Sequence, residues 1–244
     1  MSNNLWETLE DLKKHEWVDL THEFGPDTPR WPGFQPAKFE TLFDYDDGFF
    51  VKQYTFPGQY GTHLDPPVHF AEGKRTLSEL DLVELALPLV VIDLSEKVNQ
   101  NPDYVLTIDD ILEWEKEYGR IPEGSFVAFR SDWSKRWPNQ EELLNVDEEG
   151  NSHYPGWALS ALKFLYEERK IAANGHETFD TDAPILQKTD GFIGEDYVLR
   201  QDHYQIEVLA NLSKVPPKGA IIFSITPRAK DAPGFPARVF AILP

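Results

Sequence analysis

The stretch Gln59-Tyr60-Gly61-Thr62-His63-Leu64-Asp65-Pro66-Pro67-Val68-His69 gathers imidazoles, a carboxylate and turn-forming residues within one short segment. In an extended chain alternate side chains share a face, so Gln59, His63 and Asp65 are expected on one side of a strand. Gly61 lies between them and leaves room for an ion or a substrate to approach the backbone. An amide oxygen, an imidazole and a carboxylate on one face are donors that a divalent cation accepts. The stretch therefore predicts a metal site built on a strand.

The prolines that follow Asp65 end this strand. Pro66 holds Asp65 in an extended conformation, and the turn after it can bring His69 back toward the same face. A histidine outside the ligand set is well suited to transfer protons at neutral pH, and a divalent ion lowers the pKa of bound water toward about 7. His69 is thus the predicted catalytic residue. Two histidines six residues apart also occur in purely structural roles, but the Gly, Thr, Asp and Pro residues around them favour a functional loop.

Composition limits the other possibilities. The 244 residues are 41% hydrophobic, which is typical of a globular protein, and the formal charge of -19 disfavours nucleic acid and anionic membrane surfaces as partners. Cysteine is absent, which excludes thiolate nucleophiles and leaves histidine and oxygen donors for any metal. No apolar run approaches the roughly 20 residues of a membrane span, and the first residues lack a signal-peptide pattern. We expect a cytoplasmic protein with a small-molecule substrate.

Strands interleaved with helices predict a mixed α/β fold, with residues 1–244 forming a single domain. Strands are expected at 17–20, 51–57, 89–94, 125–130, 171–173, 219–225 and 238–243. Helices are expected at 5–16, 108–118 and 157–170. The Pro-rich residues 25–37 predict a shaped loop, and the acidic residues at 141–149 predict a solvated one.

Four further residues are candidates for substrate binding. Trp31 and Phe34 flank the Pro-rich loop and can line a pocket for a flat aromatic molecule, although such residues more often belong to the core. His176 follows a predicted strand end, where ligand sites of α/β proteins often lie. His203 precedes Glu207 by four residues, so the two share a face in a helix and also in a strand. His203 and Glu207 can therefore supply a second metal position.

The stretch at 59–69 resembles the hallmark His-x-Gly-Thr-His-x-Asp-x-Pro-x-His of the cyclase-type metal-dependent hydrolases, which include bacterial kynurenine formamidases (arylformamidases) and isatin hydrolases. Every fixed position except the first is present. Segments similar to other parts of the family occur at 19–33, 129–133, 206–212 and 234–238. The resemblance thus extends over nearly the whole chain. No Gly-x-Ser-x-Gly, P-loop or Gly-x-Gly-x-x-Gly motif points to a different enzyme class.

The resemblance implies a mixed-sheet domain of the swivelling β/β/α type, assembled as a homodimer or larger homo-oligomer. It implies that His63 and Asp65 are metal ligands and that His69 is the acid/base or a ligand. Glu207 then completes the site or a second metal position.

Two residues depart from the family pattern. Gln59 stands where the family has its first histidine ligand. A glutamine oxygen is a neutral, hard donor that favours Mn²⁺ over Zn²⁺, so the cofactor is expected to be one of these two ions. Glu195 stands where the formamidases have a further histidine, about twelve residues before the position of Glu207, so the family's two-zinc arrangement does not carry over directly.

The reaction implied is hydrolysis of an amide, formamide or lactam bond in a small molecule by metal-activated water. N-formylkynurenine and an isatin-like lactam are the nearest substrates, and a lactone is an alternative within the same class. The rival from a different class is a non-catalytic small-molecule or metal-binding protein on the same scaffold, because Gln59 and Glu195 both replace histidines.

Overall fold

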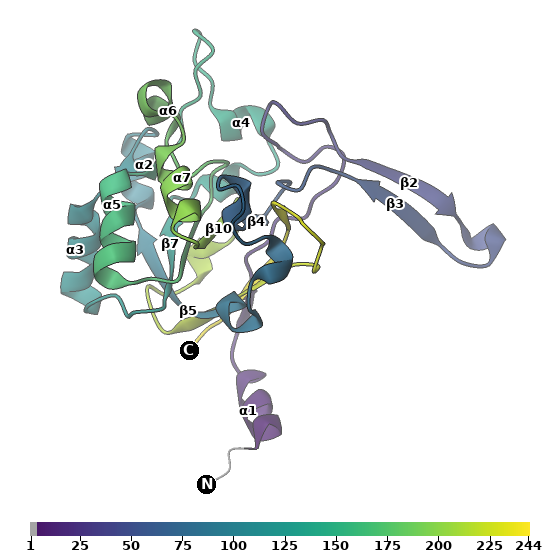
Figure 1. The fold of residues 1–244 in the computed structure, drawn as a ribbon, viewed down its shortest axis with the longest axis horizontal. Helices are drawn as coiled ribbons and strands as arrows, with labels where there is room; N and C mark the ends of the chain where they lie inside the picture. Colours follow the sequence, from purple (N-terminus) through teal and green to yellow (C-terminus); the bar gives the residue numbers. More distant parts are fainter. Residues whose placement is uncertain (1–3) are drawn as a thin grey trace.

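The computed structural model describes residues 4–244, which are built around a nine-stranded mixed sheet (Figure 1). In spatial order the strands are β1 (Trp17–Asp19), β13 (Arg238–Ile242), β11 (Ala220–Ile225), β5 (Ala86–Asp93), β7 (Phe126–Arg130), β9 (Ala173–His176), β10 (Tyr204–Glu207), β4 (His63–Asp65) and β12 (Phe235–Pro236). The run from β5 to β10 is parallel, and all other neighbours are antiparallel. The expected mixed α/β fold is confirmed. That residues 1–244 form one domain stays a prediction, and residues 1–3 lie outside the described part.

The central strands are buried on both faces, as their continuous apolar sequences predict. In β5, Leu89 and Val91 enter one hydrophobic core, whereas Val90 and Ile92 enter a second core on the opposite face. Helices α3 (Ile108–Tyr118) and α5 (Leu159–Lys163) contribute to this second core and pack side by side over the sheet (Figure 1). Two cores hold the sheet between them and give the ends of its strands a rigid base.

The helices differ in part from those predicted. They are α1 (Leu5–Leu12), α2 (Ser95–Gln100), α3, α4 (Gln140–Leu144), α5, α6 (Pro184–Asp190) and α7 (Ile193–Arg200). α3 has the predicted bounds, but the helix expected at 157–170 begins at Leu159 and continues as a wider π-helical segment, Phe164–Arg169. Its expected first residue instead belongs to strand β8 (Gly156–Trp157), which pairs with β6 (Val105–Leu106). None of the helices within residues 4–244 is long and apolar enough to cross a membrane.

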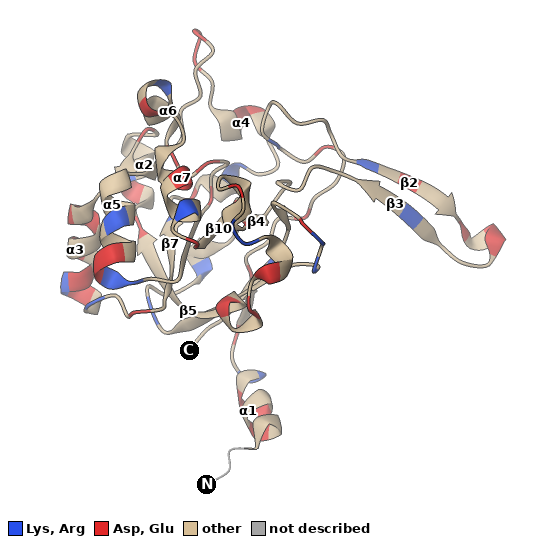
Figure 2. Cartoon of the chain, in the orientation of Figure 1, with Lys and Arg blue, Asp and Glu red and all other residues tan. Residues whose placement is uncertain are grey.

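A two-stranded ribbon projects from the body of the molecule (Figure 1). It consists of β2 (Lys38–Phe43) and β3 (Val51–Thr55), and we call residues 38–55 the arm. The strand expected at 51–57 therefore lies outside the central sheet, and β2 was not predicted. The turn at the tip of the arm is acidic (Figure 2). The arm therefore lies in the chain between the Pro-rich loop, which precedes it, and the segment with the predicted metal ligands, which follows it.

Candidate active site

Polar side chains from β9, β10 and β4 meet at one place because of the register of these strands. Glu207 stands directly opposite His63, and Gln205 stands opposite Asp65. His176 at the end of β9 lies beside Glu207, with its Nε2 3.4 Å from Glu207 Oε1. β10 therefore carries two residues of the site and lies between the strands that supply the others.

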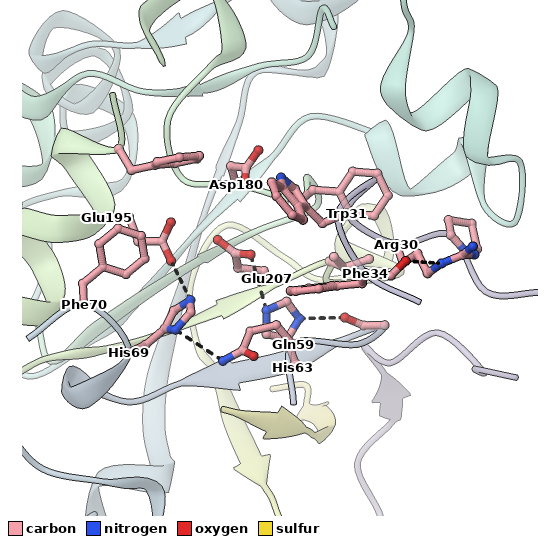
Figure 3. Close-up of a pocket in the computed structure, with 15 residues that line it drawn as sticks. Arg30, Trp31, Phe34, Gln59, His63, His69, Phe70, Asp180, Glu195 and Glu207 are labelled. Atoms are coloured by element: carbon pink, nitrogen blue, oxygen red, sulfur yellow. Dashed lines mark hydrogen bonds and ion pairs between the residues drawn. The ribbon is translucent and has the colours of Figure 1, made fainter. Parts of the chain in front are cut away.

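His63, Asp65 and Glu207 fit a divalent ion. His63 Nε2 lies 3.4 Å from Glu207 Oε2 (Figure 3). The same nitrogen lies 3.3 Å from Asp65 Oδ2. Ligand atoms that share one ion at about 2.1 Å are about 3.0 to 3.5 Å apart, so this spacing is suitable. His63 Nδ1 donates to the carbonyl oxygen of Gly61 at 2.8 Å, which leaves the lone pair of a neutral ring on Nε2. Nε2 and Asp65 Oδ2 are buried without a hydrogen-bond partner, as metal ligands lacking their ion would be.

The negative charges around this triad also favour the binding of a cation. Burial raises the pKa of Glu195 well above its ordinary value, and the nearby carboxylates of Glu207 and Asp65 raise it further. Burial and the charge of Glu207 raise the pKa of Asp180 to about 6. Although burial lowers the pKa of His63, the charges and hydrogen bonds of Asp65 and Glu207 raise it well above its ordinary value. The site thus holds an excess of buried negative charge that a divalent ion would neutralise.

Gln59, expected as an oxygen ligand, instead presents its amide nitrogen to the site. Nε2 donates to the carbonyl oxygen of Pro233 at 2.9 Å and to Asp65 Oδ1 at 3.3 Å, and it lies 3.5 Å from His69 Nδ1. Reversing the amide would place its oxygen against the Pro233 carbonyl and the Asp65 carboxylate, so the hydrogen-bond partners favour the orientation with the nitrogen toward them. Gly234 allows the approach, because a Cβ there would lie 2.1 Å from Gln59 Nε2. Gln59 therefore orients Asp65 and His69 through hydrogen bonds.

The sequence predicted that Gln59 lies on the same strand face as His63 and Asp65. Gly61 explains why this prediction is wrong for Gln59. Its φ of 63° interrupts the extended backbone, so only His63–Asp65 form strand β4. A side chain at Gly61 would also bring a Cβ to 3.2 Å from Phe24 Cβ. Gln59 reaches the site from a bend before the strand, whereas His63 and Asp65 share a face as expected.

His69 faces Glu195 across the edge of the site. It ends a short 3-10 helix, Pro67–His69, and its Nε2 lies 3.8 Å from Glu195 Oε1 on α7 (Figure 3). The His69 side chain is 28% exposed, against 5% for His63, so His69 is the more accessible of the two. Asp65, His69 and Glu195 also offer donor atoms within 4.8 Å of one another. Glu195 thus occupies a position next to the proton-transfer candidate.

A cavity of about 250 Å³ opens onto these polar groups and is lined largely by aromatic rings. Trp31 and Phe34, whose ring centroids are 5.4 Å apart, line it together with Phe70, Phe179 and Phe192. Trp31 and Phe34 thus lie in the wall of a cavity, and their role in binding a flat aromatic substrate stays a prediction. Phe179 and Phe192 were not predicted, because single aromatic residues in loops carry no distinguishing sequence pattern.

The structure places the other two candidate histidines away from the cavity lining. His203 Nδ1 donates to the carbonyl oxygen of Ala172 at 3.0 Å, and its ring packs on Tyr166 at 4.3 Å. His176 is buried, and its Nδ1 accepts from Trp157 Nε1 at 3.2 Å. The proton of a neutral His176 ring therefore lies on Nε2, which faces Glu207. Neither His176 nor His203 belongs to the cavity lining, and their roles in substrate binding stay predictions.

Backbone strain marks the residue that follows Glu207. Val208 has a φ of 56°, an uncommon conformation for a β-branched residue. Its N–H donates to the carbonyl oxygen of Thr178 at 3.1 Å, and its own carbonyl accepts from Thr62 Oγ1 at 2.6 Å. Such conformations persist where surrounding contacts hold them, and they concentrate at functional sites. The turn after β10 is therefore shaped by its neighbours, in a way that local sequence does not reveal.

A nitrogen and two carboxylates within reach of one ion, beside an accessible histidine and a cavity, are the features expected of a metal-dependent hydrolase. Comparison with known proteins narrows this class. Residues 18–183 match the family described as Putative cyclase, and the chain belongs to this family. The family expected from the residues at 59–69 is thereby confirmed.

Relatives of known activity are hydrolases. The chain is 34% identical to isatin hydrolase from Roseibium aggregatum over 94% of its own length and 92% of the relative. An isatin hydrolase bound to the product analogue thioisatinate has a TM-score of 0.91 and 30% identity, with 100% of both chains covered. Kynurenine formamidase from Geobacillus thermodenitrificans is 35% identical over 38% of this chain and 46% of its own. This protein is accordingly a metal-dependent hydrolase of the cyclase family.

Proposed function

We propose that this protein hydrolyses the amide bond of a small aromatic lactam of the isatin type, with a divalent ion held by His63, Asp65 and Glu207. The observation that carries the proposal is that a cavity with aromatic walls opens onto His63 and Glu207 of this three-donor cluster. Similarity along almost the whole chain to an isatin hydrolase supports a lactam, since the similarity to a formamidase spans a smaller part.

The residues of the chain divide the reaction between them. A divalent ion held by His63, Asp65 and Glu207 would supply polarisation of the substrate carbonyl and would lower the pKa of water toward about 7. His69, accessible from the cavity, accepts a proton as the water oxygen bonds to the carbonyl carbon. His69 then returns this proton to the ring nitrogen as the C–N bond breaks, which leaves an amine and a carboxylic acid, and the acid releases its proton to solvent to give the carboxylate. Trp31 and Phe34 hold the flat ring and keep bulk water from the reacting carbonyl.

Mn²⁺ is the ion that we propose, with Zn²⁺ as the alternative. The fitted set contains one imidazole nitrogen and two carboxylates, and oxygen-rich sets suit harder ions. Because Gln59 presents its nitrogen, the preference rests on Asp65 and Glu207 and no longer on the glutamine oxygen.

A substrate panel tests the proposed function. The protein, loaded with Mn²⁺ or with Zn²⁺, is assayed with isatin, N-formylkynurenine and an aromatic lactone, and product is followed by absorbance. We expect kcat/KM for isatin to exceed that for N-formylkynurenine by at least about tenfold, equivalent to about 1.4 kcal/mol of transition-state binding. A fully metallated protein that turns over none of the three would support the non-catalytic binding protein instead.

We also propose that the chain assembles as a homodimer or larger homo-oligomer through the arm. Monomeric proteins rarely expose large contiguous apolar patches, and a two-stranded ribbon is marginally stable by itself. The arm nevertheless exposes several large side chains: Leu42, Phe43, Tyr45, Phe49, Phe50, Val51 and Tyr54.

Light scattering tests this assembly. The wild type is expected to have at least twice the mass of one chain, and a Phe43→Ser, Phe49→Ser double variant is expected to be monomeric. The control is Leu82→Ser with Val83→Ser, which removes two exposed apolar residues outside the arm. A monomeric wild type, or an arm variant of unchanged mass, would contradict the proposal.

A further inference from the structure

Gln205 lies fully buried between two carboxylates that belong to different parts of the active site. Its Nε2 is 3.0 Å from Glu195 Oε1 and 3.1 Å from Glu207 Oε1. A side-chain amide nitrogen carries two N–H groups, so Gln205 donates one to each carboxylate. One of these carboxylates faces His69, and the other belongs to the triad that fits a metal ion.

Thr181 holds Gln205 in this orientation. Thr181 Oγ1 donates to Gln205 Oε1 at 2.6 Å, and both side chains are completely buried. If the amide were reversed, its oxygen would face two carboxylates and its nitrogen would face the hydroxyl. That arrangement replaces two favourable hydrogen bonds with two contacts between acceptors. The carbonyl oxygen of Thr181 accepts from the backbone N–H of Trp157 at 2.9 Å, which holds Thr181 in turn.

The two carboxylates depend on Gln205 to different degrees. Glu207 Oε1 also faces His176 Nε2, at 3.4 Å. For the Glu195 carboxylate, Gln205 is the one hydrogen-bond donor within residues 4–244, since His69 lies farther away at 3.8 Å. Buried carboxylates close to each other repel, and without a donor one of them takes a proton or turns away. Loss of the Gln205 N–H groups should therefore disturb Glu195 more than Glu207.

We propose that Gln205, which Thr181 holds in one orientation, is a positioning residue. It fixes both the carboxylate of Glu195 in the proton-transfer pair and the metal-binding carboxylate of Glu207. One N–H keeps Glu195 turned toward His69, and the other keeps Glu207 turned toward His63. This proposal rests on the proposed function, because proton transfer and metal binding are the two tasks that Gln205 links. It assigns to one buried amide a role that two ionised carboxylates cannot fill for each other, since an ionised carboxylate only accepts hydrogen bonds.

Three variants separate this role from simple packing. Thr181→Val removes the hydroxyl at almost constant shape, Thr181→Ser keeps the hydroxyl, and Gln205→Met removes both N–H groups at similar length. Binding of Mn²⁺ to the metal-free protein is measured by calorimetry, and kcat and KM for isatin are measured on the Mn²⁺-loaded protein. Circular dichroism and thermal unfolding check that each variant is folded.

The expected losses differ between chemistry and metal binding. Thr181→Val and Gln205→Met should lower kcat by about 100-fold, the scale of general acid–base catalysis, with KM within about threefold of wild type. Both should weaken Mn²⁺ binding by about tenfold, the lower end of what the loss of a residue behind a ligand causes. Thr181→Ser should stay within about threefold of wild type in all three quantities, because it keeps the donor to Gln205.

The proposal is overturned if folded Thr181→Val and Gln205→Met keep wild-type kcat and Mn²⁺ affinity. It is equally overturned if Thr181→Ser loses as much as Thr181→Val, because packing rather than the hydroxyl would then be responsible. If Gln205→Met does not fold, the comparison of Thr181→Val with Thr181→Ser is sufficient to test the proposal. If the wild type turns over no substrate, the proposed function fails, yet a tenfold weaker Mn²⁺ affinity in Thr181→Val alone would still support the role of Gln205 toward Glu207.

Discussion

His63 and Glu207 stand directly opposite each other on the antiparallel strands β4 and β10, with His63 Nε2 3.4 Å from Glu207 Oε2. Side chains at opposing positions of an antiparallel pair lie on the same face at close range. The two strands come from distant parts of the chain, so the ladder itself sets the spacing of the metal donors. A shift of the register by one residue would turn one of these side chains to the other face and abolish the site.

Glu207→Ala is expected to weaken Mn²⁺ binding by at least about 100-fold, because it removes one of three ligands that the fold holds in place. Calorimetry on the metal-free variant measures the effect. Asp110→Asn is the matched control, since Asp110 is another buried carboxylate but pairs with Lys97 and Thr107 far from the triad. The control should be less stable and bind Mn²⁺ like the wild type. Unchanged affinity in Glu207→Ala would remove Glu207 from the ligand set.

His69→Asn is expected to lower kcat by about 10² to 10⁴ while Mn²⁺ still binds, since His69 is assigned to proton transfer. Steady-state kinetics and calorimetry on the same preparation separate the two effects. His203→Asn is the control, because His203 bonds to Ala172 and packs on Tyr166 outside the cavity. It should lower the melting temperature and leave kcat of the folded protein intact. Equal losses of kcat in both variants would argue against this division of roles.

Trp31→Ala is expected to raise KM for isatin by about tenfold, equivalent to about 1.4 kcal/mol of binding, with little change in kcat. The reason is that Trp31 forms part of the cavity wall and does not touch the metal triad. Trp17→Ala is the control, because Trp17 is 46% exposed, against 44% for Trp31, and stacks on Phe240 at the other edge of the sheet. A KM that rises in both variants alike would point to a general loss of structure.

Because of His22, we expect the folded protein to lose stability in mild acid. Burial lowers the pKa of His22 to about 4, from about 6.5 in the unfolded chain. Between these values the unfolded chain binds a proton that the folded protein does not, so the contribution is complete above pH 6.5 and is lost as the pH falls toward 4. Urea unfolding of the metal-free protein at pH 7.5 and 5 should show this loss in the wild type and less of it in His22→Gln.

His153 serves as a control in the same experiment, because its contribution to stability should change with pH in the opposite direction. Hydrogen bonds that the His153 ring donates to the carboxylates of Asp147 and Asp103 raise the pKa of His153 above its ordinary value. Its contribution is therefore present below pH 6.5 and is lost as the pH rises through the folded pKa. His153→Gln should reduce stability more at pH 5 than at pH 7.5. The same pH trend in both variants would show that global charge, rather than these two rings, controls the response.

Elements with a strong local signal were predictable. α3 begins after Thr107, whose N–H and hydroxyl both donate to Asp110, and it has the bounds that this capping pattern indicates. β5 and β7 were recognisable from short apolar runs, because strands covered on both faces need apolar residues at every position. In each case the residues that decide the structure are neighbours in sequence.

Elements whose stability comes from distant contacts were missed. β10 has only four residues and its neighbours are β9 and β4, so nothing local distinguished it from a helix. The sequence predicted the strand at 51–57 but not its partner β2, since alternation along β3 does not reveal which strand will pair with it. Gln205 and Thr181 had no motif at all, because their importance arises only where they meet.

The sequence by itself determined the family, the mixed α/β class and the pairing of His63 with Asp65, because these depend on residues close together along the chain. Tertiary structure alone decided that Glu207 faces His63, that Gln59 presents its nitrogen, and that Glu195 stands before His69. The physical reason is that a side chain's donors and acceptors acquire a role only from the partners around them. Those partners are brought together here by strand register and helix packing, which no short segment encodes.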